Sequence, residues 1–228
     1  MKILVLDTET VSETEKFGGK NYVFDLGYVV WDTKTRSVVS KHQMLIKEVY
    51  NNPDLMKNYV FGQDRLKEAY LTQHIPQGTC AEAFTQLTQV IKNHEVEKIA
   101  AYNNRFDIDS ITTTVEKYGS DFSVNKYQWI DLYHMACQAL AGNESFVSFC
   151  LEHERVSEKG NINSNAETVY AFIKNKGDYV EEHTALEDAI IEAQICQWVL
   201  DWEEKKGIKL KTNHYGWSWK LVQPPKEK

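Results

Sequence analysis

The chain has few of the features that mark membrane, secreted or disulfide-rich proteins. Its 228 residues include only four cysteines and four prolines. No apolar run approaches the roughly 20 residues that a membrane-spanning helix needs, so we expect no membrane association. The apolar start at residues 2–6 ends at Asp7 and is too short for a secretory signal. The 42% of hydrophobic residues is typical of a folded globular protein.

The four cysteines are scattered and form no C-x-x-C pair or zinc-ligand spacing. Isolated cysteines of this kind usually pack as small apolar residues in a reducing compartment. We therefore expect a cytoplasmic protein without disulfides. These cysteines are Cys80, Cys137, Cys150 and Cys196.

Basic residues are fewer than acidic ones, 26 against 33, so the net charge is -7. Residues 205–228 hold seven lysines against one glutamate and carry +6, so the preceding residues carry -13. An acidic surface argues against a general nucleic-acid coat. Such a protein can bind an anionic polymer only where cations are supplied locally, for example by bound metal.

Hydrophobic patterning predicts a mixed α/β fold. Five apolar segments are typical of strands, at 2–6, 23–31, 37–46, 98–102 and 127–130. The second and third are predicted to form an antiparallel hairpin. Helices are predicted after Thr79 and near 107–118, 131–140, 145–153, 165–174 and 185–204. This order implies a five-stranded mixed sheet, with an antiparallel hairpin plus parallel strands, flanked by helices.

The first chemically suggestive segment is Asp7-Thr8-Glu9. On a strand, residues two apart point to the same face, so Asp7 and Glu9 would lie side by side. Two such anions repel one another unless a cation lies between them. The alternative is a solvent-exposed turn that follows the strand.

The second segment, residues 103–107, follows the fourth predicted strand and reads Asn-Asn-Arg-Phe-Asp. Asp107 would lie at a helix N-terminus, where its alternative role is an N-cap. Asp109 could compete for that role. Phe106, taken alone, is more typical of a core residue than of a contact residue.

The third segment, residues 183–188, reads His-Thr-Ala-Leu-Glu-Asp. Thr184 and Glu187 have the spacing of a capping box, which predicts Thr184 as the N-cap of the last helix. His183 then lies on the preceding loop, and Asp188 lies on the first turn. A lone histidine is more often a surface or core residue than a catalytic one.

Together the three segments describe a site for two hard cations. Carboxylate oxygens are the ligands that Mg²⁺ and Mn²⁺ prefer. Two such ions can activate a water and stabilise the leaving oxygen in a phosphoryl displacement. A histidine with a pKa near 6.5 can accept the proton of that water at neutral pH.

The order Asp7-x-Glu9, Asn103-x-x-Phe106-Asp107 and His183-x-Ala185-x-x-Asp188 resembles the DnaQ-like (DEDDh) 3′→5′ exonucleases. The resemblance spans residues 1 to about 200 and implies a ribonuclease H-like fold. It implies two divalent cations, Mg²⁺ or Mn²⁺, with His183 as general base. The implied metal ligands are Asp7, Glu9, Asp107 and Asp188. The implied substrate contacts are Thr8, Thr10, Asn103 and Phe106. Asp25-Leu26-Gly27 and Ile130-Asp131-Leu132 are weaker family-like features.

The resemblance implies an exonuclease that releases nucleoside 5′-monophosphates from a free 3′ end, with DNA favoured over RNA as the partner. One alternative is an exoribonuclease or an enzyme resembling oligoribonuclease. Another is a non-catalytic nucleic-acid-binding module on the same fold. The presence of all five polar site residues argues against the non-catalytic alternative.

We expect an exonuclease domain at 1–204, with an insertion at 47–78, and a basic, aromatic tail at 205–228. The tail interleaves lysines with aromatic residues, a pattern that suits single-stranded nucleic acid. Its alternative role is a solvated helix end followed by aromatics packed on the core. The insertion could guide substrate through its basic and aromatic side chains: Lys47, Tyr50, Lys57, Tyr59, Phe61, Arg65, Lys67 and Tyr70.

Overall fold

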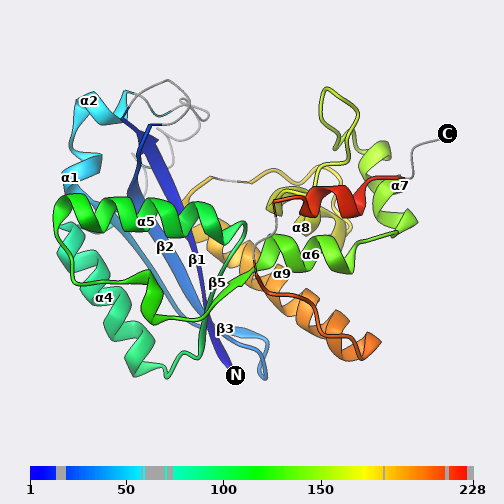
Figure 1. Ribbon diagram of the computed structural model, residues 1–228, viewed down its shortest axis with the longest axis horizontal. Coiled ribbons are helices and arrows are strands. Elements are labelled where there is room, and N and C mark those ends of the chain that lie inside the picture. The colour runs from blue at the N-terminus through cyan, green and yellow to red at the C-terminus, as the bar shows by residue number, and fades with distance from the viewer. Residues whose placement is uncertain are drawn as a thin grey trace.

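A computed structural model describes residues 1–13, 19–57, 59, 70, 74–181, 183–213 and 216–224. A mixed sheet runs through the centre of the molecule, with helices on both faces (Figure 1). Its strands are β1 (Lys2–Ser12), β2 (Asn21–Asp32), β3 (Ser37–Ile46), β4 (Gln77–Gly78), β5 (Lys98–Ala101) and β6 (Trp129–Asp131).

The strand order is β4-β3-β2-β1-β5-β6. The β1–β2 and β2–β3 pairs are antiparallel, and β5 and β6 add to β1 in parallel. The sequence predicted this mixed sheet correctly but counted five strands. The sixth, β4, has two residues and pairs in parallel with the end of β3. Two residues are too few to produce a hydrophobic pattern.

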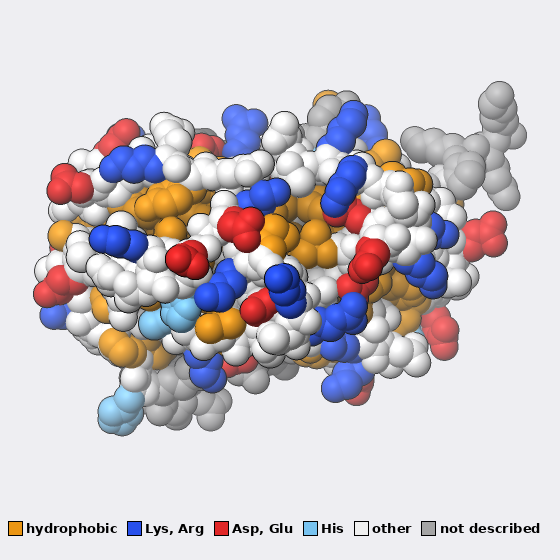
Figure 2. All heavy atoms as spheres, turned by 90° about the horizontal axis from the view of Figure 1, so that it is seen from below, with side chains coloured by type: hydrophobic (Ala, Val, Ile, Leu, Met, Phe, Trp, Pro, Cys, Tyr) orange, Lys and Arg blue, Asp and Glu red, His pale blue; other side chains and the backbone are white. Residues whose placement is uncertain are grey.

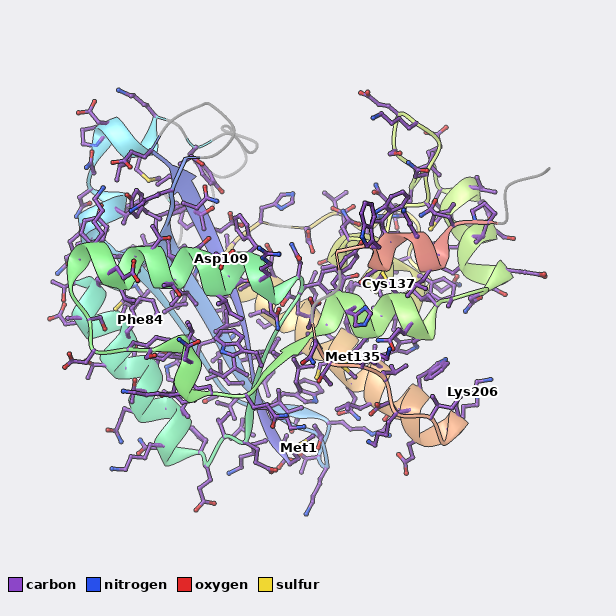
Figure 3. The ribbon with its side chains drawn as sticks, in the orientation of Figure 1. Met1, Phe84, Asp109, Met135, Cys137 and Lys206 are labelled. Carbon is purple, nitrogen blue, oxygen red and sulfur yellow. The ribbon has the colours of Figure 1, made fainter. Side chains whose placement is uncertain are left out.

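The helices are α1 (Lys47–Tyr50), α2 (Pro53–Met56), α4 (Cys80–Asn93), α5 (Asn104–Tyr118), α6 (Leu132–Ala139), α7 (Glu144–Glu152), α8 (Ala166–Lys174) and α9 (Ala185–Lys206). Helices α4 and α5 cover one face of the sheet, where Phe84 of α4 is labelled in Figure 3. Helix α9 crosses the other face, and α6, α7 and α8 gather beyond it (Figure 1).

Alternation along β1 produces two hydrophobic cores. Leu4 and Leu6 pack in the cluster that contains α4 and α5. Ile3 and Val5 pack in the cluster that contains α6 and α9. Because side chains alternate along a strand, Asp7 and Glu9 continue the row of Ile3 and Val5 toward α9. The acidic pair therefore extends a buried apolar row.

The C-terminal segment after α9 returns to the body of the protein. The backbone N–H of Asp131 donates to the carbonyl of Thr212 at 2.8 Å. The short helix η2 (Ser218–Val222) packs beside α6, and Val222 is buried there. Ser218 and Val222 of this segment are buried, whereas the aromatic Trp217 is 56% exposed.

The insertion contains α1 and α2, and its described residues Tyr59 and Tyr70 are directed inward. Phe61, Arg65 and Lys67, which the sequence analysis singled out, lie outside the described residues. All four cysteines are buried and free, as predicted. Within the described ranges, no helix combines the length and the apolar character needed to cross a membrane.

Charge is mixed on the face that Figure 2 shows, which lies at the bottom of Figure 1. Lysine and arginine side chains alternate there with acidic ones around small apolar patches. Because its charge is mixed, this face does not provide the continuous basic surface that a nucleic-acid coat protein would need.

Candidate active site

Three of the predicted carboxylates meet between β1 and the start of α9. One oxygen each from Asp7, Glu9 and Asp188 lies within 4.8 Å of the others. Asp7 and Glu9 share a face of β1, and Asp188 lies in the first turn of α9. The motif Asp7-x-Glu9 lies inside β1, which continues to Ser12, so the alternative of an exposed turn is wrong.

Gly27 permits this close approach. It is the register partner of Asp7 on the neighbouring strand β2. A Cβ at Gly27 would lie 2.1 Å from the carbonyl carbon of Ala185, the first residue of α9. Only a residue without a side chain lets the helix N-terminus rest on the strand here. The absence of one side chain therefore brings Asp188 toward Asp7.

Asp25 fixes the same helix start. It is the register partner of Glu9, and its Oδ2 accepts the backbone N–H of Ala185 at 3.3 Å. The same oxygen accepts the Gln43 amide and the Tyr70 hydroxyl, both at 2.7 Å. Burial raises the pKa of Asp25 to about 6, against the lowering effect of these donors. A carboxylate from the sheet thus satisfies a helix N-terminus.

The predicted capping box at Thr184 does not form. Thr184 is the N-cap residue, but its side chain makes no capping bond. Its Oγ1 is buried and has no hydrogen-bond partner among the described residues. Asp25, 160 residues away from Ala185, supplies the acceptor instead. The predicted position of the N-cap is correct, but the predicted side-chain bonds are absent. A capping-box pattern considers only residues of the first helical turn and cannot show a distant acceptor such as Asp25.

Asp107 reaches the site from the other face of the sheet. It lies in α5, and Asn103 is the N-cap residue, so the alternative of an Asp107 N-cap is wrong. Asp107 is buried, and its Oδ1 accepts the hydroxyl of Thr8 at 2.8 Å. Asp109, the other candidate, lies on α5 (Figure 3) and is exposed, 3.7 Å from the guanidinium of Arg105.

Mutual repulsion and burial raise the pKa values of these carboxyls. Burial followed by the charge of Asp25 raises the pKa of Asp7 to about 7. Burial followed by Asp7 raises the pKa of Glu9 to about 9 and that of Asp188 to about 10. The pKa of Asp107 is also raised well above its usual range, for the same two reasons.

The residues present fit hard divalent cations. Buried like charges this close must take up protons or gather around cations. The second Asp188 oxygen, Oδ1, is buried and has no hydrogen-bond partner in the described part of the chain. A buried polar atom without a partner is costly, and metal coordination removes that cost. Carboxylate oxygens are the ligands that Mg²⁺ and Mn²⁺ prefer.

His183 lies beside this group rather than within it. Its backbone is left-handed, with φ 57°, and its Nδ1 lies 3.9 Å from Glu181 Oε2. Glu167, Glu181 and His183 form a second group whose atoms lie within 4.8 Å of one another. Burial followed by the charge of Asp7 raises the pKa of Glu181 to about 8, so Glu181 links the two groups.

Arg155 anchors the segment that leads to His183. Its guanidinium pairs with Glu167 at 2.8 Å and donates to the carbonyls of Gly177 and Tyr179. The other Glu167 oxygen accepts the backbone N–H of Glu181 at 3.1 Å. The Arg155–Glu167 pair is largely buried. It therefore holds the segment 177–181 from two sides.

The four predicted substrate contacts divide into two kinds. Asn103 is exposed and Phe106 is 41% exposed, and both lie at the start of α5. Thr10 is half-buried on β1. The Thr8 side chain is buried and bonded to Asp107, so it positions that carboxylate and does not face solvent.

Sequence reasoning missed two residues around the site, Glu181 and Glu192, and gave Tyr59 and Tyr70 a different role, that of guiding substrate. Tyr59 donates its hydroxyl to Glu9 Oε2 at 3.2 Å, and Tyr70 donates to Asp25. Glu192 lies one turn after Asp188 on α9 and is buried, and Glu181 lies beside His183. The i, i+4 spacing of Asp188 and Glu192 is the one local signal that could have found Glu192.

No profile of a known family and no curated protein sequence matches the chain. A full-length 3′-exonuclease structure matches with a TM-score of 0.58 and 11% identity, over 94% of this chain and 64% of that chain. E. coli Exonuclease I in complex with a dT13 oligonucleotide matches with a TM-score of 0.60 and 15% identity, over 90% of this chain and 42% of that chain.

The nuclease domain of 3′hExo, a DEDDh family member solved with bound rAMP, matches with a TM-score of 0.51 and 11% identity. That match covers 93% of this chain and 96% of the domain. The chain spans less than two thirds of the full-length 3′-exonuclease and of Exonuclease I. The predicted ribonuclease H-like fold class is confirmed, and the chain has the fold of the DnaQ-like 3′-exonucleases.

Proposed function

We propose that the protein is a metal-dependent 3′→5′ exonuclease. The observation that carries this proposal is the convergence of Asp7, Glu9 and Asp188 within 4.8 Å, beside Asp107. The fold supports the same proposal, because its structural neighbours are 3′-exonucleases. Water would attack the phosphorus of the last phosphodiester, and the bond to the 3′ oxygen would break. The products are a nucleoside 5′-monophosphate and a strand with a new 3′ hydroxyl.

The carboxylates of Asp7, Glu9, Asp107 and Asp188 would hold two divalent cations, Mg²⁺ or Mn²⁺. When bound, such cations stabilise the negative charge that develops on the phosphate oxygens. Thr8 orients Asp107 through its hydroxyl, and Tyr59 orients Glu9. Partners of this kind fix the orientation of metal-binding side chains.

His183 would act as the general base and accept the proton of the attacking water. Its side chain is 42% exposed beside the carboxylate group, so a bound substrate strand can reach it. Glu181 lies near its Nδ1 and would favour the orientation in which the other ring nitrogen faces the site. Asn103 and Phe106, both exposed, and Thr10 would contact the 3′-terminal nucleotide.

We propose single-stranded DNA as the substrate and a cytoplasmic location. RNA is the alternative substrate. One structural neighbour was solved with the ribonucleotide rAMP, whereas another was solved with an oligo-dT strand. Four free, buried cysteines support a reducing compartment. The proposed catalytic domain is 1–204, with 205–228 as an appended segment.

The test uses 5′-labelled single-stranded DNA, duplex DNA and RNA, each with Mg²⁺, Mn²⁺ or EDTA. We expect a ladder of products shortened from the 3′ end, with Mg²⁺ or Mn²⁺ only. A closed circular single strand should remain intact, because it has no 3′ end. Rapid cutting of the circle, or undiminished hydrolysis in EDTA, would contradict the proposal. Binding of all strands without hydrolysis would favour the non-catalytic alternative.

A further inference from the structure

A cleft opens beside the carboxylate group, on the side of α6 and η2. Its volume is about 750 Å³, which falls within the usual range of ligand sites. Three aromatic side chains line it, from Tyr102, Tyr133 and Trp219. Asparagine and serine side chains complete the wall, including Asn103, Asn161 and Asn163. In Figure 3, Met135 and Cys137 mark α6, the helix that begins next to this cleft.

The cleft is joined to the candidate active site through its wall. The backbone N–H of Tyr102 donates to Glu192 Oε2 at 3.1 Å, and Glu192 faces the carboxylate group. The next residue, Asn103, lines the cleft and is the N-cap residue of α5, which carries Asp107. A strand whose 3′ end lies at the carboxylates therefore has this cleft directly beside it.

Long-range hydrogen bonds hold the cleft open. The Tyr102 hydroxyl donates to the carbonyl of Ser164. The Gln223 side chain makes two bonds with the backbone of Ile162, at 2.8 and 3.1 Å. These bonds join the turn after β5, the segment 157–165 and the segment after α9 into one wall. A preformed site of this kind loses little entropy on binding.

The chemistry of the wall suits a nucleobase rather than a phosphate. Among the described residues that line the cleft, none carries a charge. Aromatic rings stack on bases of any sequence, and asparagine amides can both donate to and accept from base edges. Asn163 is exposed and Asn161 is half-buried in the wall of the cleft. Their amides are therefore available to a ligand.

We propose that this cleft is a subsite for an unpaired nucleobase of the substrate strand, on the 5′ side of the scissile phosphodiester. The inference rests on the proposed function. The cleft would hold the strand by stacking on Trp219 and by bonds from the amides of Asn161 and Asn163. It would thereby favour single strands, because a base paired in a duplex cannot enter. Substrate affinity then depends on a base that is not itself released.

The experiment combines abasic substrates with Trp219 variants. Single-stranded DNA oligonucleotides of six nucleotides each lack one base, at successive positions from the 3′ end. In the wild-type protein we expect one position at which the missing base raises KM by about tenfold, as loss of one stacked base does. In Trp219→Ala, that penalty should disappear, because the stacking partner is already absent. Trp219→Phe should keep most of it.

Trp217 provides a matched control in the same segment. It is 56% exposed, lies outside the cleft, and has the Lys220 ammonium 3.9 Å above its ring. Trp217→Ala should therefore keep the wild-type penalty. A general loosening of the segment would affect both variants, whereas loss of a base subsite affects only Trp219→Ala.

The outcomes separate this inference from the proposed function. Normal 3′→5′ hydrolysis with the same abasic profile in wild type and Trp219→Ala overturns the subsite and leaves the exonuclease intact. The same oligonucleotides are also tested for binding, by fluorescence anisotropy in an Asp188→Asn background. An abasic penalty in Kd that depends on Trp219, without hydrolysis by the wild type, supports the subsite and overturns the exonuclease.

Discussion

The two halves of the candidate site are supported in different ways. The carboxylates stand on regular elements, with Asp7 and Glu9 on β1, Asp107 on α5 and Asp188 on α9. His183 stands on the connection between α8 and α9, which Arg155 and Glu167 hold through backbone carbonyls and an N–H. A helix or strand fixes a side chain through its whole backbone, whereas this connection depends on a few side-chain bonds. The carboxylate half should therefore tolerate peripheral changes better than the histidine half.

The largest effect is expected from the carboxylates themselves. Asp7→Ala and Asp188→Ala should each lower kcat by several orders of magnitude in the presence of Mg²⁺. Without metal, each variant should be at least as stable as the wild type, because one repelling charge is gone. Turnover assays and thermal melts in EDTA measure the two effects.

Asp109→Ala is the matched control for the carboxylate variants. Asp109 lies on the same helix as Asp107 but is exposed, and it pairs with Arg105. Its loss should leave turnover and stability close to those of the wild type. A collapse of activity in Asp109→Ala would move the metal site to the outer face of α5.

The next largest effect is expected from His183→Ala. Loss of a positioned base should lower kcat by roughly 10²–10⁴-fold. The affinity for Mn²⁺, measured by calorimetry, should not change, because the four carboxylates are untouched. Near wild-type turnover at neutral pH and saturating substrate would remove His183 from the mechanism.

Gly27→Ala tests how the sheet positions the carboxylate half. The new Cβ would lie 2.1 Å from the Ala185 carbonyl carbon, so α9 must shift and carry Asp188 away from Asp7. We expect weaker metal binding, lower kcat and a loss of about 1–3 kcal/mol in unfolding free energy, as overpacking usually causes. Gly216→Ala is the stability control, because an added Cβ there meets no atom within 4 Å. Equal melting temperatures for both variants would refute the close contact.

Arg155→Lys tests the histidine half alone. A lysine keeps the charge but cannot bond Glu167 and two carbonyls in the same plane. We expect kcat to fall on the order of tenfold or more, because small misplacements of a catalytic group are costly. Metal affinity should stay the same, and this split between kcat and metal binding is the measurement. A parallel loss of both would mean that the two halves are one unit.

The smallest effect is the pH dependence of stability without metal. The pKa values of Asp7, Glu9 and Glu181 in the folded protein are about 7, 9 and 8, above their ordinary values near 4. Between about pH 4 and pH 9 the folded state therefore retains protons that the unfolded state has released. Stability from these groups is fully present below about pH 4 and is lost as pH rises through that window.

The measurement is the melting temperature in EDTA and in Mg²⁺ from pH 5 to pH 9. The EDTA curve should fall with rising pH. Mg²⁺ should raise the melting temperature more at pH 8 than at pH 5, because the cation takes the place of the protons. A stabilisation by Mg²⁺ that is independent of pH would show that the cation binds elsewhere.

Much of the fold could be predicted from the sequence. The strand Ser37–Ile46 has its predicted bounds, and the helices α6 to α9 begin within a residue or two of their predicted starts. Helices α6 and α8 carry a clear hydrophobic period, which is a local property of the chain. Three of the carboxylates that the sequence singled out, Asp7, Glu9 and Asp188, come together in the structure, and their role as metal ligands stays a prediction.

The short or buried features were not predictable in that way. The strand β4 has two residues, and β1 continues past Asp7 through polar residues to Ser12. The polar half of β1 extends the strand because it pairs with β2 up to Asn21. A sequence pattern cannot show that pairing.

The sequence by itself determined which residues are candidates for the chemistry and in what order most of the elements follow, because motif spacing and hydrophobic patterning are local properties of the chain. Only the tertiary structure decided how those residues are held. Asp25 caps α9 across 160 residues, and Thr8 holds Asp107 across 99. Trp219 reaches the cleft from beyond the last long helix. Contacts between residues so far apart in the sequence form when the sheet and its helices pack together. No local sequence pattern indicates which distant partner a buried polar atom will bond.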